Sequence, residues 1–144
     1  LPHANLILLD SGKRGILGDK QLDWLAQQLD ERKNKPALIF AHYNPSRNPG
    51  VRPIRGMKDG EALLKVLAQR KQAHAYIHGH THEWLNSKHA HLHIIGQPAV
   101  SYYFGKGHAH GWIDMRMTKA SANLELHCLK PEHSQQGEQV EIEF

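Results

Sequence analysis

The chain of 144 residues has one cysteine, Cys128, and no hydrophobic run long enough to cross a bilayer. One thiol can form neither an internal disulfide nor a thiolate zinc cage, and a membrane span needs roughly 18 apolar residues in a row. The net charge of +4 is too small for the dense basic face of a dedicated nucleic-acid binder. The first residues show no basic leader with a long apolar core. We therefore expect a cytoplasmic protein without a membrane span and without dedicated nucleic-acid binding.

Histidine, by contrast, is abundant, with 13 residues. His80 and His82 follow Gly79 at the end of a short apolar run, and His42 ends another such run, Pro36 to Ala41. Neutral imidazole is the commonest protein ligand for transition metals. Open α/β sheets build their sites from residues at the ends of adjacent strands. The pattern therefore indicates part of a metal site.

The first half of the chain alternates between short apolar runs and amphipathic segments with helical spacing. The strands are expected at Asn5 to Leu9, Pro36 to Ala41 and Ala73 to His78, and the helices at about Asp19 to Lys33 and Asp59 to Lys71. Asp19 and Asp59 are the candidate N-caps of these helices. This order predicts an α/β fold, a mixed sheet with crossover helices.

The second half has the alternating pattern of antiparallel strands. His89 to Ile95 alternates, with three histidines on one face, and the period repeats at Ile113 to Met117 and at Leu124 to Cys128. A polar linker from Lys130 to Glu138 precedes a tail strand, Gln139 to Phe144. We expect a domain over residues 1–129, followed by the linker and tail strand at 130–144.

Four motifs together resemble the calcineurin-like metallophosphoesterases, the superfamily of purple acid phosphatases and cyclic-nucleotide phosphodiesterases. They are Leu8-Leu9-Asp10-Ser11, Gln21-Leu22-Asp23-Trp24-Leu25, Ile39-Phe40-Ala41-His42 and Gly79-His80-Thr81-His82. The resemblance covers about residues 6 to 117 and implies the C-terminal half of a four-layer α/β/β/α sandwich. It also implies a metal-dependent hydrolase of phosphate mono- or diesters, with a nucleotide among the expected substrates.

In this family two metal ions lie about 3.5–4 Å apart, bridged by an aspartate and a hydroxide. The resemblance assigns His42 and His80 to one ion and His82 to the other, and manganese, iron or zinc, divalent or trivalent, would suit such ligands. The family's Asp-x-His, strand-end Gly-Asp and Gly-Asn-His motifs, the last of which carries the catalytic histidine, are absent from this sequence. We therefore expect partial or no metal occupancy and an inactive chain, as a truncated, cleaved or separately encoded half.

The loop after His42 is rich in arginine and lacks acidic residues. Arg47, Arg52 and Arg55 are candidates for binding the anionic ester, and the alternative is a solvated loop with incidental charge. His108, in a glycine-flanked segment, joins the candidate substrate-binding residues, or it belongs to a plain hairpin turn.

Two rival hypotheses remain open. One is a non-enzymatic, histidine-rich metal-binding module that uses His89, His91 and His93, or His108 and His110; the alternating set would otherwise face water. The other is an interaction module. Half of a sandwich exposes an apolar sheet face, which the missing N-terminal half or a second copy of the chain would cover.

Overall fold

The first half of the chain builds a five-stranded sheet from short, aliphatic strands. In the computed structural model, which describes residues 1–46, 56–102, 105 and 107–144, the strands run in the order β1-β2-β3-β5-β4. β1, β2, β3 and β5 are parallel, and β4 is antiparallel to β5. The strand bounds are β1 Asn5–Leu8, β2 Ala37–Ala41, β3 Ala73–His78, β4 Leu85–His89 and β5 Leu92–Gly96.

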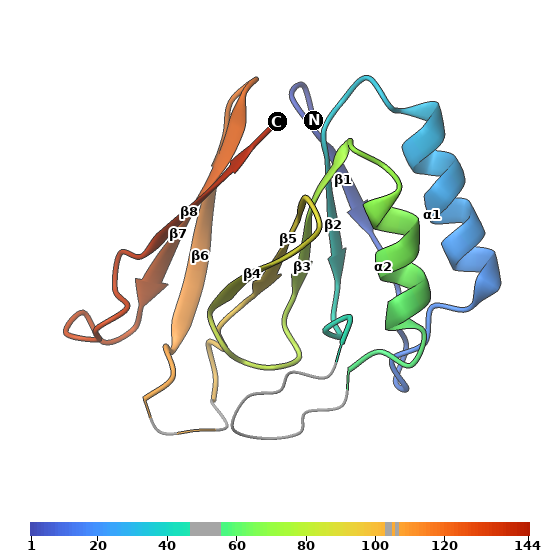
Figure 1. Ribbon diagram of the computed structural model, residues 1–144. Coiled ribbons are helices and arrows are strands. Elements are labelled where there is room, and N and C mark those ends of the chain that lie inside the picture. Colours follow the sequence, from blue (N-terminus) through green and yellow to red (C-terminus); the bar gives the residue numbers. More distant parts are fainter. Residues whose placement is uncertain (47–55, 103–104, 106) are drawn as a thin grey trace.

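The two crossover helices lie on one face of this sheet (Figure 1). α1 spans Asp19–Glu31 and α2 spans Gly60–Ala68, so both end two or three residues before the expected position. Leu22, Leu25 and Leu29 of α1 are buried at helical spacing, as the sequence predicts. Among the described residues, neither helix is long and apolar enough to cross a membrane.

The side-chain caps predicted at Asp19 and Asp59 do not form. α1 is preceded by Gly18, and neither helix has a side-chain hydrogen bond at its cap. Asp59 does precede α2, but its Oδ2 accepts hydrogen bonds from the backbone N–H groups of Leu17 (2.9 Å) and Gly18 (2.8 Å). The carboxylate therefore connects the start of α2 to the start of α1.

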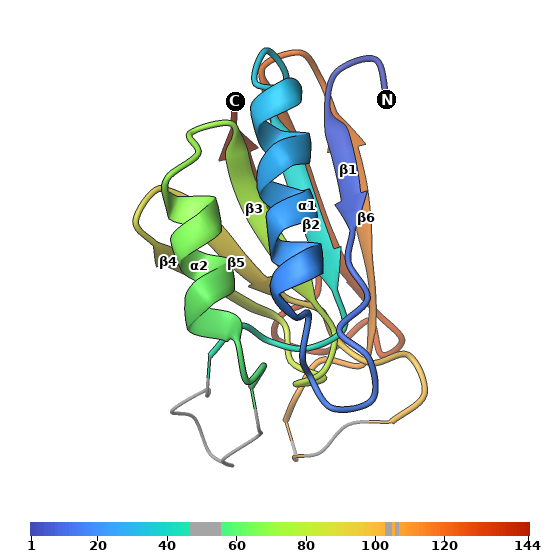
Figure 2. The ribbon, with the colours of Figure 1, turned by 90° about the vertical axis from the view of Figure 1, so that its right-hand side faces the viewer.

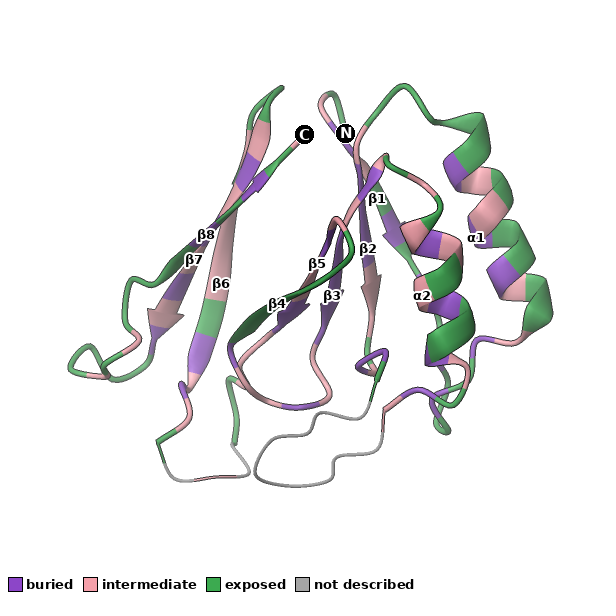
Figure 3. Ribbon diagram, viewed as in Figure 1, coloured by how far each residue is buried: buried purple, intermediate pink, exposed green. Residues whose placement is uncertain are grey.

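The stretch His89 to Ile95 is not the single strand that its alternation predicts. It is a hairpin, in which β4 ends at His89 and β5 begins at Leu92. Ala90 lies in the turn with a φ of 54°, a left-handed conformation that is uncommon without glycine. β4 is exposed along its whole length (Figure 3), so no hydrophobic pattern marked it as a strand.

A second, antiparallel sheet covers the other face of the first one (Figure 1). Its strands β6 (Gly111–Met117), β7 (Ser121–Cys128) and β8 (Gln139–Glu143) pair in that order. Leu124, Leu126 and Ile142 of this sheet are buried in one core cluster with β2, β3 and β5. The expected tail strand therefore exists as β8 and pairs with β7. The boundary at residue 129 remains a prediction.

The described chain thus forms three layers, α/β/β, of the expected α/β/β/α sandwich. The mixed sheet and its crossover helices are confirmed. The apolar sheet face that was expected to be exposed is mostly covered, because the chain supplies strands to both sheets. What stays open is one flank, where the edge strands β1 and β6 lie on the same side of the molecule (Figure 2). Leu6 and Leu8 of β1 are 39% and 73% exposed there.

Candidate metal centre and anion pocket

The candidate site lies where the neighbouring parallel strands β2 and β3 end. His42 directly follows β2, and Gly79 and His80 directly follow β3. The backbone N–H groups of Gly79 and His80 both donate to the carbonyl oxygen of His42, at 3.1 and 2.9 Å. These bonds join the two strand-end loops and bring the two histidines together, as the sequence predicts.

The rings of His42 and His80 meet at this edge. Nε2 of His42 lies 3.2 Å from Nδ1 of His80, and the ring centroids are 5.1 Å apart. Two nitrogen ligands at 2.0–2.1 Å from one ion would be about 3.0–3.4 Å apart, so this spacing fits a shared metal. Burial, and then the charges of His42 and His82, lower the pKa of half-buried His80. His80 is therefore neutral at pH 7, the form that binds a metal.

His82 has a different environment. Its Nδ1 lies 3.0 Å from the carbonyl oxygen of Tyr102, and since a carbonyl only accepts, Nδ1 carries the proton and the lone pair is on Nε2. A carbonyl that fixes the tautomer in this way is typical of metal-binding histidines. Among the described residues, no three His, Cys, Asp or Glu side chains converge on one ion position. His42 and His80 thus form a pair, with His82 beside them.

His78, the last residue of β3, is a structural residue. Its side chain is buried, and burial lowers its pKa to about 4, with smaller contributions from the charges of His80 and His42. A Cβ at Gly96 of the neighbouring strand β5 would lie 3.3 Å from Cε1 of His78 and 2.6 Å from the carbonyl oxygen of Glu83. A glycine at position 96 therefore makes room for the buried imidazole.

Tyr43 links the histidine pair to the rest of the site, a role that sequence analysis missed. Its ring centroid is 4.1 Å from that of His80 and 5.3 Å from that of His42. Its hydroxyl donates to the carbonyl oxygen of Lys13 at 3.1 Å, and its own carbonyl accepts a 2.6 Å bond from the hydroxyl of buried Tyr76. Tyr43 is therefore fixed at both ends beside the histidine pair.

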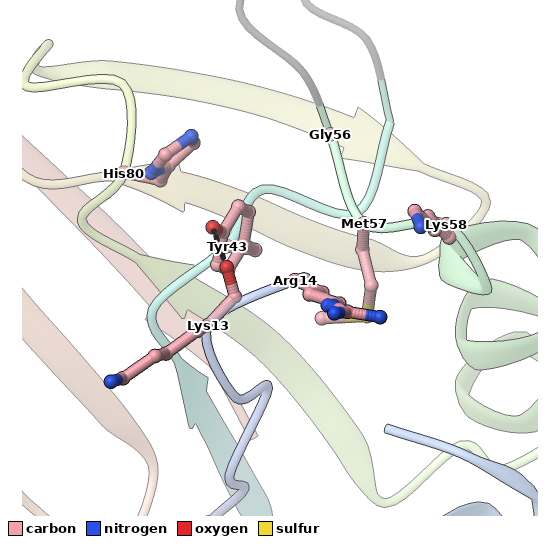
Figure 4. A pocket seen from close by; sticks show the side chains of 7 residues that line it. All are labelled: Lys13, Arg14, Tyr43, Gly56, Met57, Lys58 and His80. Atoms are coloured by element: carbon pink, nitrogen blue, oxygen red, sulfur yellow. Dashed lines mark hydrogen bonds between the residues drawn. The ribbon is translucent and has the colours of Figure 1, made fainter. Parts of the chain in front are cut away.

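A cavity of about 840 Å³ opens beside Tyr43 and His80 (Figure 4). It combines three cationic side chains with His80, and no carboxylate is among the described residues that line it. The lining residues are Lys13, Arg14, Tyr43, Gly56, Met57, Lys58 and His80. Sequence analysis did not select Lys13 and Arg14. They lie within the loop between β1 and α1 and not directly after the strand, so the strand-end rule that found His42 does not reach them.

The predicted substrate-binding residues are not brought together by the described structure. Arg47, Arg52 and Arg55 lie outside the described residues. His108 does not line the cavity beside His80; its Nδ1 is 3.4 Å from Oε1 of Glu83, the residue after His82. Its role in substrate binding remains a prediction.

One interpretation of the alternating histidines His89, His91 and His93 was that they all face water. Two of the three instead have polar partners within the protein. Nε2 of His91 is 3.3 Å from the carbonyl oxygen of Arg70, and Nδ1 of His93 is 3.2 Å from Oδ1 of Asn86. His89 is exposed at the end of β4.

Comparison with known proteins agrees with the fold. The calcineurin-like phosphoesterase family model matches residues 4–84, more than half of the chain. A probable cyclic nucleotide phosphodiesterase of Synechococcus sp. is 35% identical over 105 residues, which are 69% of this chain and 40% of that protein. The 3′,5′-cyclic adenosine monophosphate phosphodiesterase CpdA of Pseudomonas aeruginosa is 27% identical over 128 residues, 85% of this chain and 46% of CpdA.

Among solved structures, a dimetal phosphatase from Danio rerio superposes with a TM-score of 0.69 at 20% identity. The match covers 89% of this chain and 38% of that one, and at this identity it concerns the fold alone. The chain spans less than half the length of the curated relatives it matches. With the family model, the relatives and the fold in agreement, this chain belongs to the calcineurin-like phosphoesterase family.

Proposed function

We propose that the chain supplies the histidine side of a two-metal centre that hydrolyses phosphate mono- or diesters. The 3.2 Å separation of Nε2 of His42 and Nδ1 of His80 supports this most directly, because it is the spacing of two ligands on one ion. The activities named for the relatives, cyclic nucleotide phosphodiesterases, favour a nucleotide as the substrate.

In this proposal His42 and His80 hold one ion and His82 holds the other. Manganese, iron or zinc suit imidazole ligands completed by carboxylates. Bound metals supply Lewis acidity and an activated water for in-line attack on phosphorus. The three imidazoles take no part in proton transfer, since their lone pairs are used for binding. The carbonyl of Tyr102 orients His82, and the ring of Tyr43 packs against His80.

We further propose that the site is incomplete in this chain. Three neutral imidazoles cannot balance the charge of two divalent or trivalent ions, and the family's carboxylate-bearing motifs are absent from the sequence. The carboxylates and the catalytic histidine would come from a partner that covers the open flank at β1 and β6 (Figure 2). That partner is the missing N-terminal half, because a second copy of the chain would cover the flank but would lack the same motifs. The isolated chain is then expected to bind metal weakly and to be inactive.

Calorimetric titration of the purified chain with Mn²⁺ and Zn²⁺ tests both parts of the proposal. We expect weak binding that is lost in His42→Ala and in His80→Ala, and that is unchanged in His89→Ala, a matched control at the exposed end of β4. Two tightly bound ions per chain would reject the incomplete site. Binding that survives His80→Ala would reject this metal centre and favour the histidine-rich module.

A further inference from the structure

The loop between β1 and α1 forms one wall of the cavity and has a fixed backbone. The carbonyl of Lys13 accepts the hydroxyl of Tyr43, and the carbonyl of Gly15 accepts the backbone N–H of Lys58 at 2.8 Å. Gly15 has a φ of +64°, and a Cβ there would lie 2.9 Å from Cδ1 of Tyr43. Arg14 lies between these two anchored residues, so its backbone is held on the wall of the cavity that His80 also lines, even though its side chain is exposed.

Arg14 and Lys58 lie on the side of the Tyr43 ring that faces away from His80 (Figure 4). The ammonium group of Lys13 points away from both of them (Figure 4). Within the described part of the chain, neither Arg14 nor Lys58 has an ion pair with a carboxylate. Cationic side chains that line a cavity without counter-charges attract anions and raise their local concentration.

The two backbone N–H groups just before α1 do not provide the anion site instead. The backbone N–H groups of Leu17 and Gly18, at the start of α1, donate to the carboxylate of Asp59. An anion in the cavity would therefore bind the side chains of Arg14 and Lys58. A guanidinium suits phosphate oxygens by its paired donors, and an ammonium acts as a point charge.

We propose that Arg14 and Lys58 hold a second anionic group of the substrate, across the Tyr43 ring from the histidine pair His42 and His80. The substrate class is then a phosphate ester with at least one further phosphate or carboxylate, such as a nucleotide with a second phosphate. An ester with a single negative charge, such as the cyclic nucleotides named for the relatives, would not use both groups of the site. This inference rests on the proposed phosphoesterase function, because it places the reacting phosphate at His42 and His80. The cavity of about 840 Å³ falls within the usual size of small-molecule sites, roughly 300–1,000 Å³.

The test compares two inorganic probes on the chain, in the presence of a metal chelator. Pyrophosphate carries two linked anionic groups and orthophosphate only one. We expect pyrophosphate to bind more tightly in an NMR titration, and to shift the backbone signals of Arg14 and Lys58. Two partly screened charge contacts correspond to about a five- to tenfold loss of affinity in the Arg14→Ala/Lys58→Ala double variant. The double variant Lys33→Ala/Lys119→Ala removes two exposed cations in turns outside the cavity; it is the charge-matched control and should bind like the parent chain.

Unchanged pyrophosphate affinity in the Arg14→Ala/Lys58→Ala variant would overturn the inference. An equal loss in the Lys33→Ala/Lys119→Ala control would also overturn it, because that result reduces the effect to net charge. Both substitutions change exposed side chains, and circular dichroism checks that the variants are folded. The metal titration of His42→Ala and His80→Ala is an independent measurement. If the histidine variants bind metal like the parent chain while the Arg14→Ala/Lys58→Ala variant loses affinity for pyrophosphate, the metal centre is wrong and the anion site stands. If the histidine variants lose metal binding while the double variant keeps its affinity for pyrophosphate, the anion site alone is rejected.

Discussion

Asp59→Ala is expected to destabilise the fold by detaching the two helices at their starts. The Oδ2 of Asp59 accepts two backbone hydrogen bonds, from Leu17 at 2.9 Å and from Gly18 at 2.8 Å. Both donors are more than 40 residues away along the chain, so the carboxylate acts as a tertiary contact. Its removal leaves two N–H groups, one of them on buried Leu17, without their acceptor.

The size of the effect follows from the type of bond. A hydrogen bond to a charged group contributes about 1.5–3 kcal/mol. Asp59 is half-buried, so water will replace part of what is lost, and we expect the free energy of unfolding to fall by about 2–3 kcal/mol. With a urea m-value of about 2 kcal/mol/M for a domain of this size, the midpoint should fall by about 1–1.5 M.

Urea unfolding followed by tryptophan fluorescence measures this shift. Asp19→Ala is the matched control, since Asp19 lies in the first turn of α1 and forms no cap hydrogen bond. It should lose only its interaction with the helix dipole, about 0.3–1 kcal/mol. If Asp19→Ala destabilises the chain as much as Asp59→Ala, Asp19 is the true cap and the bridge at Asp59 is refuted.

Two further predictions concern β3. Tyr76→Phe should lower the free energy of unfolding by about 1–3 kcal/mol, because the carbonyl of Tyr43 loses its 2.6 Å bond; an unchanged urea midpoint would contradict this. Burial, opposed in part by a backbone hydrogen bond at Glu143, lowers the pKa of His74 from its ordinary 6.5. Below that pH the unfolded chain binds the proton more readily, so stability should fall as the pH drops under 6.5. His74→Gln should flatten this pH dependence of the midpoint, and an unchanged slope would count against it.

Hydrophobic periodicity was sufficient to place most of the fold. It located β3 at its observed bounds and α1 from the spacing of its buried leucines. It missed β4, whose residues are all exposed and whose pairing depends on β5 rather than on burial of its own side chains. It also extended β5 back through the turn to His89, because a left-handed turn at Ala90 leaves no glycine or proline in the sequence to mark it.

The site was predictable to a similar extent, and for a related reason. The carboxyl ends of adjacent parallel strands meet at one edge of a sheet, so residues directly after β2 and β3 could be expected to meet there. His42 and His80 do so. The orientation of the loop after β1 follows no such local rule, because it is fixed by partners 30 or more residues away, Tyr43 for Lys13 and Asp59 for Leu17.

The difference between strand ends and loops also explains why the cations of the cavity were harder to predict than His80. Arg14 and Lys58 are exposed side chains, and an exposed cation in a sequence carries no sign of what faces it. The role that we propose for them depends on the backbone hydrogen bond between Lys58 and Gly15, which brings two distant loops together beside Tyr43. In the function that we propose, the position of a metal ligand is thus encoded in the strand that precedes it, whereas selectivity for the substrate is encoded in contacts between loops.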